Sequence, residues 1–279
     1  MAETLVTGLR IGECARWHDG RLWFANWGEA EVRSADLGGE TRVEVEVPTA
    51  GIPISIDWLA DGRLLIVCGP EGRVLRREPD GSLTAHAELT AISEHAWNEI
   101  VVDGRDGVYV NTINFDMMGG GEFAPGLIAL ITPDGEVRQV AEGLQFPNGM
   151  VITPDGSTLI VAESFAGRLT AFDVDGDGGL SNRRVWAELG DGGDGICLDS
   201  EGAVWAPSMK ACVRVREGGE VLDRVELDRF CFACALGGED RRTLMMMAAN
   251  WLGPERMFDG PPSGEVQVAP APAPGAGRP

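Results

Sequence analysis

The stretch Thr153-Pro-Asp-Gly-Ser-Thr-Leu-Ile-Val-Ala162 places a tight turn directly before a short apolar run. Thr-Pro-Asp-Gly is typical of a turn, and four apolar residues bounded by turn signals fit a buried strand better than a helix. The same arrangement occurs six times along the chain. The apolar runs begin at Leu22, Leu64, Val108, Leu159, Val204 and Leu244, behind turns at Asp19-Gly20, Asp61-Gly62, Asp106-Gly107, Asp155-Gly156, Glu201-Gly202 and Glu239-Asp240.

The repeat length indicates the fold. Successive runs start 42, 44, 51, 45 and 40 residues apart, and a second alternating strand follows each of them, as in Gly167-Arg-Leu-Thr-Ala-Phe-Asp173. Short strands at regular intervals without a helical stripe are typical of an all-β protein. Repeats of about 45 residues match four-stranded antiparallel blades. The sequence therefore predicts a six-bladed β-propeller.

The two ends of the chain differ from the repeats. Glu3-Thr-Leu-Val-Thr-Gly-Leu9 resembles an outer strand such as Val137–Leu144, but it precedes the first blade. Because an unpaired strand leaves an exposed edge, we expect this segment to complete the last blade. Residues 1–268 are predicted to form one propeller domain, and the Pro/Ala-rich tail 269–279 is expected to be extended or disordered.

Composition narrows the classes of partner. Acidic residues outnumber basic ones 44 to 23, giving a formal net charge of −21 over 279 residues, so phosphate backbones and anionic membranes would be repelled. No apolar run approaches the roughly 18 residues of a membrane span. The first ten residues lack a secretory signal, so a cytoplasmic location is expected. A small molecule is the expected partner, and the oligomeric state stays open.

The cysteines fit free thiols better than a disulfide framework, because only six occur in a long chain without an export signal. Cys231 and Cys234 form one C-x-x-C flanked by Phe230 and Phe232. With no second pair and no nearby histidine, a zinc site would lack ligands. This motif is predicted to lie in a buried strand.

Polar residues open the innermost strand of four blades. They are Glu13, Asn98, Asn148 and Asp194, in segments otherwise dominated by small or apolar residues. Innermost strands line the central channel, so equivalent positions of different blades converge there. Oxygen ligands without histidine or thiolate suit a hard divalent cation. The alternative is that each residue separately belongs to a turn or caps a loop.

Five motifs together resemble the senescence-marker-protein, regucalcin and gluconolactonase family of six-bladed propellers, over roughly Leu5 to Trp251. They are Gly12-Glu13-Cys14 with Trp17, Trp97-Asn98-Glu99, Phe146-Pro147-Asn148-Gly149-Met150, Ala162-Glu163-Ser164 and Asp194-Gly195-Ile196-Cys197-Leu198-Asp199. The resemblance implies one divalent cation held by Glu13, Asn148 and Asp194, with Asn98 contacting substrate or a cation-bound water. Calcium is favoured, with magnesium, manganese or zinc as alternatives.

The resemblance also implies hydrolysis of a lactone, with the cation as Lewis acid. Asp194 and Asn98 are the predicted catalytic residues, Asp194 serving as general base. Sugar-lactone hydrolases of the family often carry Arg two residues before this Asn and Asp after it, whereas this chain has Ala96 and Glu99. A contact to a sugar hydroxyl is thus expected to be lost.

The segment Asn114–Pro125 is rich in glycine and is long enough to fold across the channel mouth. Such a lid favours a less polar lactone. Its methionines could instead fill the core of the loop itself. The predicted substrate-binding residues are Trp97, Asn98, Glu99, Phe115, Asp116, Met117, Glu122 and Ser164.

Other activities stay open. A metal-dependent aryl-esterase or phosphotriesterase would use the same kind of cation, and a non-catalytic calcium-binding or peptide-binding propeller would use it only for stability. A serine hydrolase triad is disfavoured, because the chain has three histidines and no Gly-x-Ser-x-Gly elbow. A role for His95, three residues before Asn98, is left open.

Overall fold

The Asp-Gly turns close hairpins, as their residue types require. Gly62, Gly156 and Gly202 have φ of 83°, 72° and 77°, the left-handed region that glycine enters without strain. Their N–H groups donate to the carbonyls three residues earlier, at Leu59, Thr153 and Asp199. The apolar runs after these turns form the second strand of each blade, and most of their side chains are fully buried.

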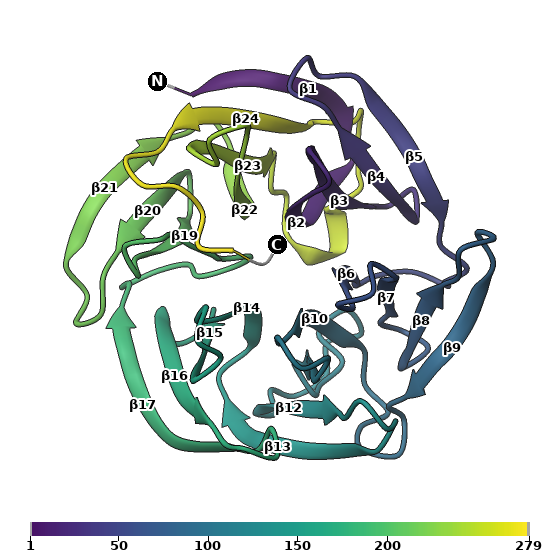
Figure 1. Cartoon of the computed structure of the whole chain (residues 1–279). Helices are drawn as coiled ribbons and strands as arrows, with labels where there is room; N and C mark the ends of the chain where they lie inside the picture. Colours follow the sequence, from purple (N-terminus) through teal and green to yellow (C-terminus); the bar gives the residue numbers. More distant parts are fainter. Residues whose placement is uncertain (1, 278–279) are drawn as a thin grey trace.

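The computed structural model describes residues 2–277 and contains six four-stranded antiparallel sheets arranged around a central axis (Figure 1). The predicted six-bladed propeller is confirmed. Blades 1 and 2 comprise β2 (Ile11–His18), β3 (Arg21–Trp27), β4 (Glu31–Ala35), β5 (Thr41–Glu46), β6 (Ile54–Trp58), β7 (Leu64–Cys68), β8 (Arg73–Arg77) and β9 (Leu83–Glu88). Blades 3 and 4 comprise β10 (Trp97–Val102), β11 (Val108–Thr112), β12 (Gly126–Ile131), β13 (Val137–Leu144), β14 (Pro147–Ile152), β15 (Thr158–Glu163), β16 (Arg168–Val174) and β17 (Leu180–Glu188).

Blades 5 and 6 complete the ring. They comprise β18 (Cys197–Leu198), β19 (Val204–Ser208), β20 (Ala211–Val215), β21 (Val221–Glu226), β22 (Phe230–Gly237), β23 (Thr243–Ala249), β24 (Gly264–Pro270) and β1 (Glu3–Leu9). The N-terminal strand β1 pairs with β24 as the outer strand of blade 6, which confirms the predicted closure. The ring therefore joins its two ends by hydrogen bonds within one sheet.

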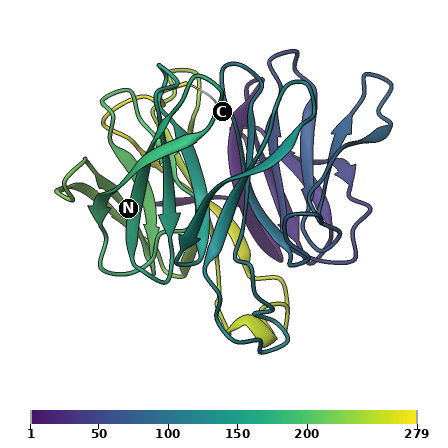
Figure 2. The same cartoon turned by 90° about the horizontal axis from the view of Figure 1, so that it is seen from below.

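The propeller has two different faces. Inner strand β2 begins at Ile11 beside Trp27 and ends at the Asp19-Gly20 turn, so Glu13 and the turn lie at opposite ends of the strand. Loops 113–125 and 250–263 leave the sheets at the Glu13 end, and the latter carries η1 (Pro254–Arg256). Figure 2 shows both loops projecting from its lower side, with the C-terminus on the upper side.

The tail covers the turn face. Strand β24 continues to Pro270, two residues past the predicted end of the propeller, and residues 271–277 then cross from blade 6 to blade 5. The N–H groups of Ala271 and Gly275 donate to Arg242 and Arg241, and that of Ala276 donates to Leu198. Ala273 is fully buried. Residues 1, 278 and 279, which belong to the predicted domain and tail, lie outside the described residues.

A buried ion-pair network fixes the end of β15. Glu163 is fully buried and accepts hydrogen bonds from Arg168 and Arg183 at 3.0–3.2 Å and from the backbone N–H of Gln145 at 2.6 Å. Burial raises its pKa, but the hydrogen bonds from Thr170 and Gln145 and the two arginines outweigh burial and hold the pKa below its usual value. The network therefore stabilises the charged carboxylate.

We expect Glu163→Gln to lower the free energy of unfolding at pH 7 by about 3 kcal/mol, since two arginines lose a buried partner. A folded-state pKa below the unfolded value gives stability that is present above the unfolded pKa and lost as pH falls through the folded pKa. The urea midpoints of wild type and variant should therefore differ at pH 7 and converge below about pH 4. As a control, exposed Glu142→Gln should change stability by less than about 0.5 kcal/mol.

Candidate metal centre at the channel mouth

A β-bulge interrupts the inner strand of each blade in which Glu13, Asn98 or Asn148, the predicted site residues near the start of an inner strand, lies on that strand. The pairing register shifts between Glu13 and Arg16, between Trp97 and Ile100, and between Pro147 and Met150. Of the inner strands in the two blades without a predicted site residue, β6 of blade 2 shows no shift, whereas β22 of blade 6 has one between Cys231 and Ala233. Bulges re-aim side chains and break the in-and-out alternation of a strand. They explain how polar residues face the channel within otherwise apolar strands.

Three carboxylates come together at this end of the channel: Glu13 and Glu99 are buried, and Asp194 is half-buried with a buried Oδ1 atom. Burial raises the pKa of Glu13 well above its usual value, and the charges of Asp194 and Glu99 raise it further. Burial and the charge of Glu99 likewise raise the pKa of Asp194, whereas the Asn148 side chain and the Gly195 N–H lower it. Such mutual influence requires proximity, so Glu13 of blade 1, Glu99 of blade 3 and Asp194 of blade 5 lie near one another.

Asp194 carries an unpaired oxygen. Its Oδ1 atom is buried and has no hydrogen-bond partner among residues 2–277. A buried carboxylate oxygen without a partner costs free energy unless a cation or a donor satisfies it. Together with Glu13 and the amide of Asn148, this oxygen gives the donor set that hard divalent cations prefer. The residues present thus fit a divalent cation.

The two asparagines are held by their amide nitrogens. Asn148 Nδ2 donates to Ser164 Oγ at 3.3 Å, and Ser164 Oγ donates in turn to the carbonyl of Gly193 at 2.6 Å. Asn98 Nδ2 donates to the carbonyl of Pro147 at 3.2 Å. Because the nitrogens are engaged with protein acceptors, the amide oxygens are the atoms that can meet a cation or a substrate. Ser164 therefore orients Asn148.

The glycines after Asn148 and Asp194 serve close packing. Gly149 lies within β14, so Asn148-Gly149 is not a turn, and a Cβ atom there would lie 2.5 Å from the carbonyl oxygen of Asp194 and from the nitrogen of Ile196. The N–H of Gly149 donates to the Asp194 carbonyl at 3.2 Å. Blades 4 and 5 thus approach closely between two of the predicted ligands.

Two further buried polar residues surround the site and were not predicted. Arg16 Nη2 lies 3.3 Å from Glu99 Oε2 and 2.8 Å from the carbonyl of Ile100. Asn111 is fully buried, accepts the N–H of Glu99 at 3.2 Å and donates to the carbonyl of Asn148 at 2.7 Å. Asn111 therefore ties blade 3 to blade 4 beside the bulges. Its place at the end of an apolar run is the only signal that the sequence offers.

We expect Asn111→Ala to weaken cation binding about tenfold, because partners that orient ligands carry effects of this size. It should also destabilise the fold by about 2 kcal/mol, since a backbone N–H and a carbonyl lose their partner. Calorimetric titration of the cation and urea unfolding measure the two effects separately. Asn26→Ala is the matched control: Asn26 is equally buried but accepts only the N–H of Arg10, at 3.1 Å, and its loss should leave cation affinity unchanged.

The predicted lid loop carries an aromatic cluster. Phe115 is buried and its ring lies 5.5 Å from that of Phe123, 6.2 Å from that of Phe146 and 6.3 Å from that of Phe165. Phe123 and Phe165 are 45% and 59% exposed. The cluster therefore presents an apolar surface beside Asn148, contributed by loop 113–125 and by blade 4. The two blade 4 phenylalanines were not predicted as substrate contacts.

Four other predicted substrate contacts lie as follows. Asp116 and Glu122 are exposed, Asp116 Oδ1 accepts the N–H of Gly119 at 2.7 Å, and Met117 is half-buried. Trp97 is fully buried in the core between blades 2 and 3, where its indole N–H donates to the carbonyl of Ser93. Their roles in substrate binding stay predictions. The same holds for Glu99, whose carboxylate pairs with Arg16. A role for His95, which lies in the loop before β10, stays open.

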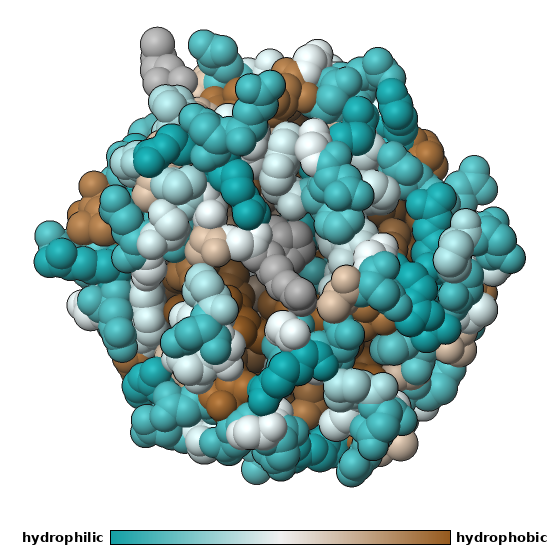
Figure 3. All heavy atoms as spheres, in the orientation of Figure 1, coloured by the Kyte–Doolittle hydropathy of each residue, from teal (hydrophilic) through white to brown (hydrophobic). Residues whose placement is uncertain are grey.

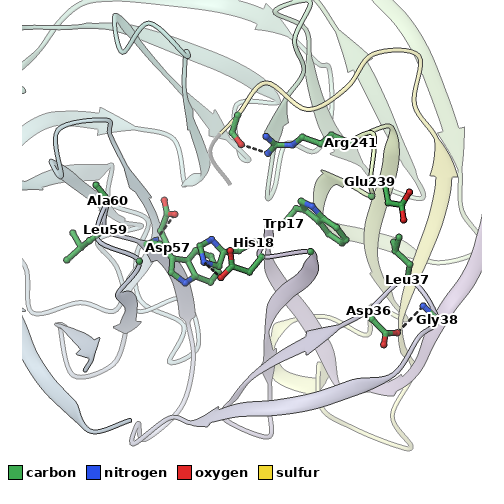
Figure 4. A pocket seen from close by; sticks show the side chains of 16 residues that line it. Trp17, His18, Asp36, Leu37, Gly38, Asp57, Leu59, Ala60, Glu239 and Arg241 are labelled. Carbon is green, nitrogen blue, oxygen red and sulfur yellow. Dashed lines mark hydrogen bonds and ion pairs between the residues drawn. The ribbon is translucent and has the colours of Figure 1, made fainter. Parts of the chain in front are cut away.

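A cavity lies on the opposite face. It has a volume of about 980 Å³ and is lined by turns of blades 1, 2 and 6, including Trp17, His18 and Trp58 (Figure 4). The rings of His18 and Trp58 stack with centroids 4.1 Å apart. Figure 3 shows this face largely covered by hydrophilic residues. None of the predicted ligands lines this cavity.

Two features are absent from residues 2–277. In this range no group of three or more His, Cys, Asp or Glu side chains is arranged to hold a metal ion, so the candidate centre depends on the Asn148 amide as well as on two carboxylates. The same range holds no helix with the length and hydropathy of a membrane span.

Comparisons with known proteins show which family this chain resembles. Residues 11–250 match the model of the SMP-30/gluconolactonase/LRE-like region. Regucalcin of Danio rerio is 29% identical over 177 residues, which cover 60% of this chain and 59% of the relative. Diisopropyl-fluorophosphatase of Loligo vulgaris is 28% identical over 201 residues, which cover 57% and 64%. The chain thus spans about three fifths of the length of each of these curated relatives.

Solved structures share the fold. A calcium-binding regucalcin from Agrobacterium tumefaciens superposes with a TM-score of 0.79 at 23% identity, over 100% of this chain and 95% of that one. A gluconolactonase from Xanthomonas campestris gives 0.77 at 21% identity, over 97% and 90%. Since the family model covers most of the propeller, the chain belongs to the SMP-30/gluconolactonase/LRE-like family.

Proposed function

We propose that this protein is a divalent-cation-dependent hydrolase that opens a lactone. The observation that carries the proposal is the buried, unpaired Oδ1 of Asp194 beside Glu13 and Asn148. Glu13, Asn148 and Asp194 would hold the cation, and calcium is favoured because all three supply oxygen. Gluconolactonases and a calcium-binding regucalcin of the same fold support both parts of the proposal.

A bound cation would supply Lewis acidity to the lactone carbonyl. The chain's own groups perform the rest. The Asp194 carboxylate takes the proton of the attacking water. Asn98, held by Pro147, directs its amide oxygen toward the substrate or water, and Ser164 keeps Asn148 in position. Arg16 is buried and pairs with the Glu99 carboxylate at 3.3 Å, which balances one of the negative charges beside these residues.

The aromatic cluster indicates the substrate class. Phe123 and Phe165 expose apolar surface beside Asn148, and Ala96 stands where many sugar-lactone hydrolases carry Arg. Burial of an alkyl group against such rings is favourable, by roughly 25 cal/mol per Å² of apolar surface. We therefore propose a lactone with an alkyl substituent in preference to a sugar lactone.

The second candidate is hydrolysis of a phosphotriester or an aryl ester. The relative diisopropyl-fluorophosphatase favours it, since the oxygen donors of the candidate centre would serve a phosphoryl oxygen as well as a carbonyl oxygen. A cation that only ties the blades together is the non-catalytic alternative.

The test is proton release by cation-stripped protein after calcium, magnesium, manganese or zinc is restored singly. The substrates are glucono-δ-lactone, alkyl γ- and δ-lactones, an aryl acetate and a dialkyl aryl phosphate. Turnover of alkyl lactones that requires a cation supports the proposal. Turnover of only the ester or the phosphate assigns the second candidate. Thermal stabilisation by a cation without turnover of any substrate assigns the non-catalytic alternative.

A further inference from the structure

Four of the six cysteines gather between blades 5 and 6 and form what we call the thiol cluster. Its members are Cys197 on β18, Cys212 on β20, and Cys231 and Cys234 on β22, all buried and all in the same apolar core. The C-x-x-C of β22 thus gains a second pair of thiols from blade 5, which the linear sequence does not show. Cys14 and Cys68 lie outside this cluster, in the core of the first blades.

The thiols of the cluster contact one another: Cys212 interacts with Cys231 and Cys234, and Cys197 interacts with Cys234. Cys197 Sγ lies 3.6 Å from Cys234 Sγ. A disulfide needs a separation of about 2.05 Å, so the sulfurs would have to approach by about 1.5 Å. The two strands are already joined: Gly195 pairs with Ala233 in a parallel bridge, and the N–H of Gly195 donates to the carbonyl of Phe232 at 2.8 Å. The backbone therefore holds both cysteines in place for cross-linking.

The same pair is connected to the candidate metal centre. The N–H of Cys234 donates to the carbonyl of Gly195 at 2.9 Å, and its thiol lies 3.4 Å from that oxygen and 3.3 Å from the carbonyl of Trp205. Gly195 directly follows Asp194. When the sulfur of Cys234 moves toward Cys197, it loses its contact with the Gly195 carbonyl. Oxidation of Cys234 would therefore affect the backbone that positions Asp194, the proposed metal ligand.

We propose that Cys197 and Cys234 form a reversible disulfide between blades 5 and 6 on exposure to a peroxide, and that this bond weakens cation binding at Asp194. One thiol sulfur attacks the peroxide, the O–O bond breaks, and a sulfenic acid and one water form. The second sulfur attacks the sulfenic sulfur, the S–O bond breaks, and the hydroxyl leaves with the thiol proton as a second water. Two thiols are oxidised and one hydrogen peroxide is reduced to two waters.

The bond itself is independent of the proposed function, whereas its effect on the cation rests on it. The experiment treats the folded full chain with hydrogen peroxide, removes excess peroxide, and then unfolds the chain in the presence of N-ethylmaleimide, because all six thiols are buried in the folded state. Tryptic peptides are then mapped by mass spectrometry. Trypsin separates Cys197 (residues 185–210) from Cys212 (residues 211–214) and from the peptide 230–241 that carries Cys231 and Cys234. Calorimetric titration with calcium follows on untreated and treated protein.

A linked pair of peptides 185–210 and 230–241, lost on dithiothreitol treatment, is the expected product. It should persist in Cys231→Ala and in the control Cys68→Ala, and it should be absent from Cys234→Ser, which keeps a hydrogen-bonding group beside Gly195. Calcium affinity should fall about tenfold on oxidation and recover on reduction. Six blocked thiols after treatment, or a bond to Cys212 instead, would overturn the disulfide. A Cys197–Cys234 bond with unchanged calcium affinity would overturn the coupling alone.

Discussion

Replacement of Asp194 by Asn should abolish lactone turnover and weaken cation binding together. The substitution keeps the size of the side chain but removes the charge that a cation needs and the base that accepts the proton from water. General-base catalysis alone contributes up to about 10⁴-fold, so we expect kcat to fall by at least about a thousandfold at saturating cation. Steady-state kinetics at several cation concentrations and calorimetric titration provide the two readings.

The matched control is Asp191→Asn. Asp191 lies in the same loop, is exposed and accepts a hydrogen bond from Ser208 Oγ at 2.6 Å, and its loss should change kcat by less than about twofold. Asn98→Ala provides the contrast, since it should raise KM more than it lowers kcat and leave cation affinity in place. Near-normal turnover by cation-loaded Asp194→Asn would show that the base assignment is wrong.

Replacement of Glu13 by Gln should stabilise the cation-free protein while removing its stabilisation by cation. Glu13 and Glu99 are buried close to the half-buried Asp194, and among the described residues only Glu99 has a paired arginine, Arg16. Removal of one carboxylate relieves like-charge repulsion and a desolvation cost. We expect the Tm without cation to rise by about 3 °C, since 1 kcal/mol corresponds to 2–4 °C in a chain of this size class.

The stability of the cation-free protein should fall as pH rises from about 5 to 7. Burial raises the pKa of Glu13 and of Asp194 above the unfolded values, so protonation stabilises the cation-free fold. That contribution is full below the unfolded pKa and is lost as pH rises through the folded pKa. Thermal scans without cation should therefore show a higher Tm at about pH 5 than at pH 7, and a smaller difference in Glu13→Gln. Exposed Glu46→Gln should behave as wild type. A lower cation-free Tm for Glu13→Gln would contradict the repulsion.

The fold could be predicted because its signals are local. An Asp-Gly turn requires a left-handed residue at a fixed place, and six such turns at similar spacing fix six hairpins before any long-range contact is known. The closure of the ring by Glu3–Leu9 could also be predicted. An outer strand has a recognisable sequence pattern, and blade 6 had no such strand of its own. The convergence of Glu13, Asn148 and Asp194 followed from the register of the repeats.

The remaining features of the site and of the thiol cluster depend on contacts between blades. The spacing of the sequence repeats does not specify those contacts. Asn111 closes an apolar run like any strand residue, yet its amide joins Glu99 to Asn148 across a blade boundary. The pairing of Cys197 with Cys234 likewise requires knowledge of how β18 meets β22. Segment Asn114–Pro125 was predicted as a lid, but the packing of its Phe123 against Phe165 depends on the path of that segment in space.

The most direct test of the account is an anomalous difference map from crystals grown with Mn²⁺. Manganese accepts the same oxygen donors as calcium and scatters anomalously, so the map locates the ion independently of activity. We expect one strong peak at the channel mouth, bonded to side-chain oxygens of Glu13, Asn148 and Asp194. A well-ordered channel mouth without a peak, or a peak held by other residues, would contradict the proposed metal centre.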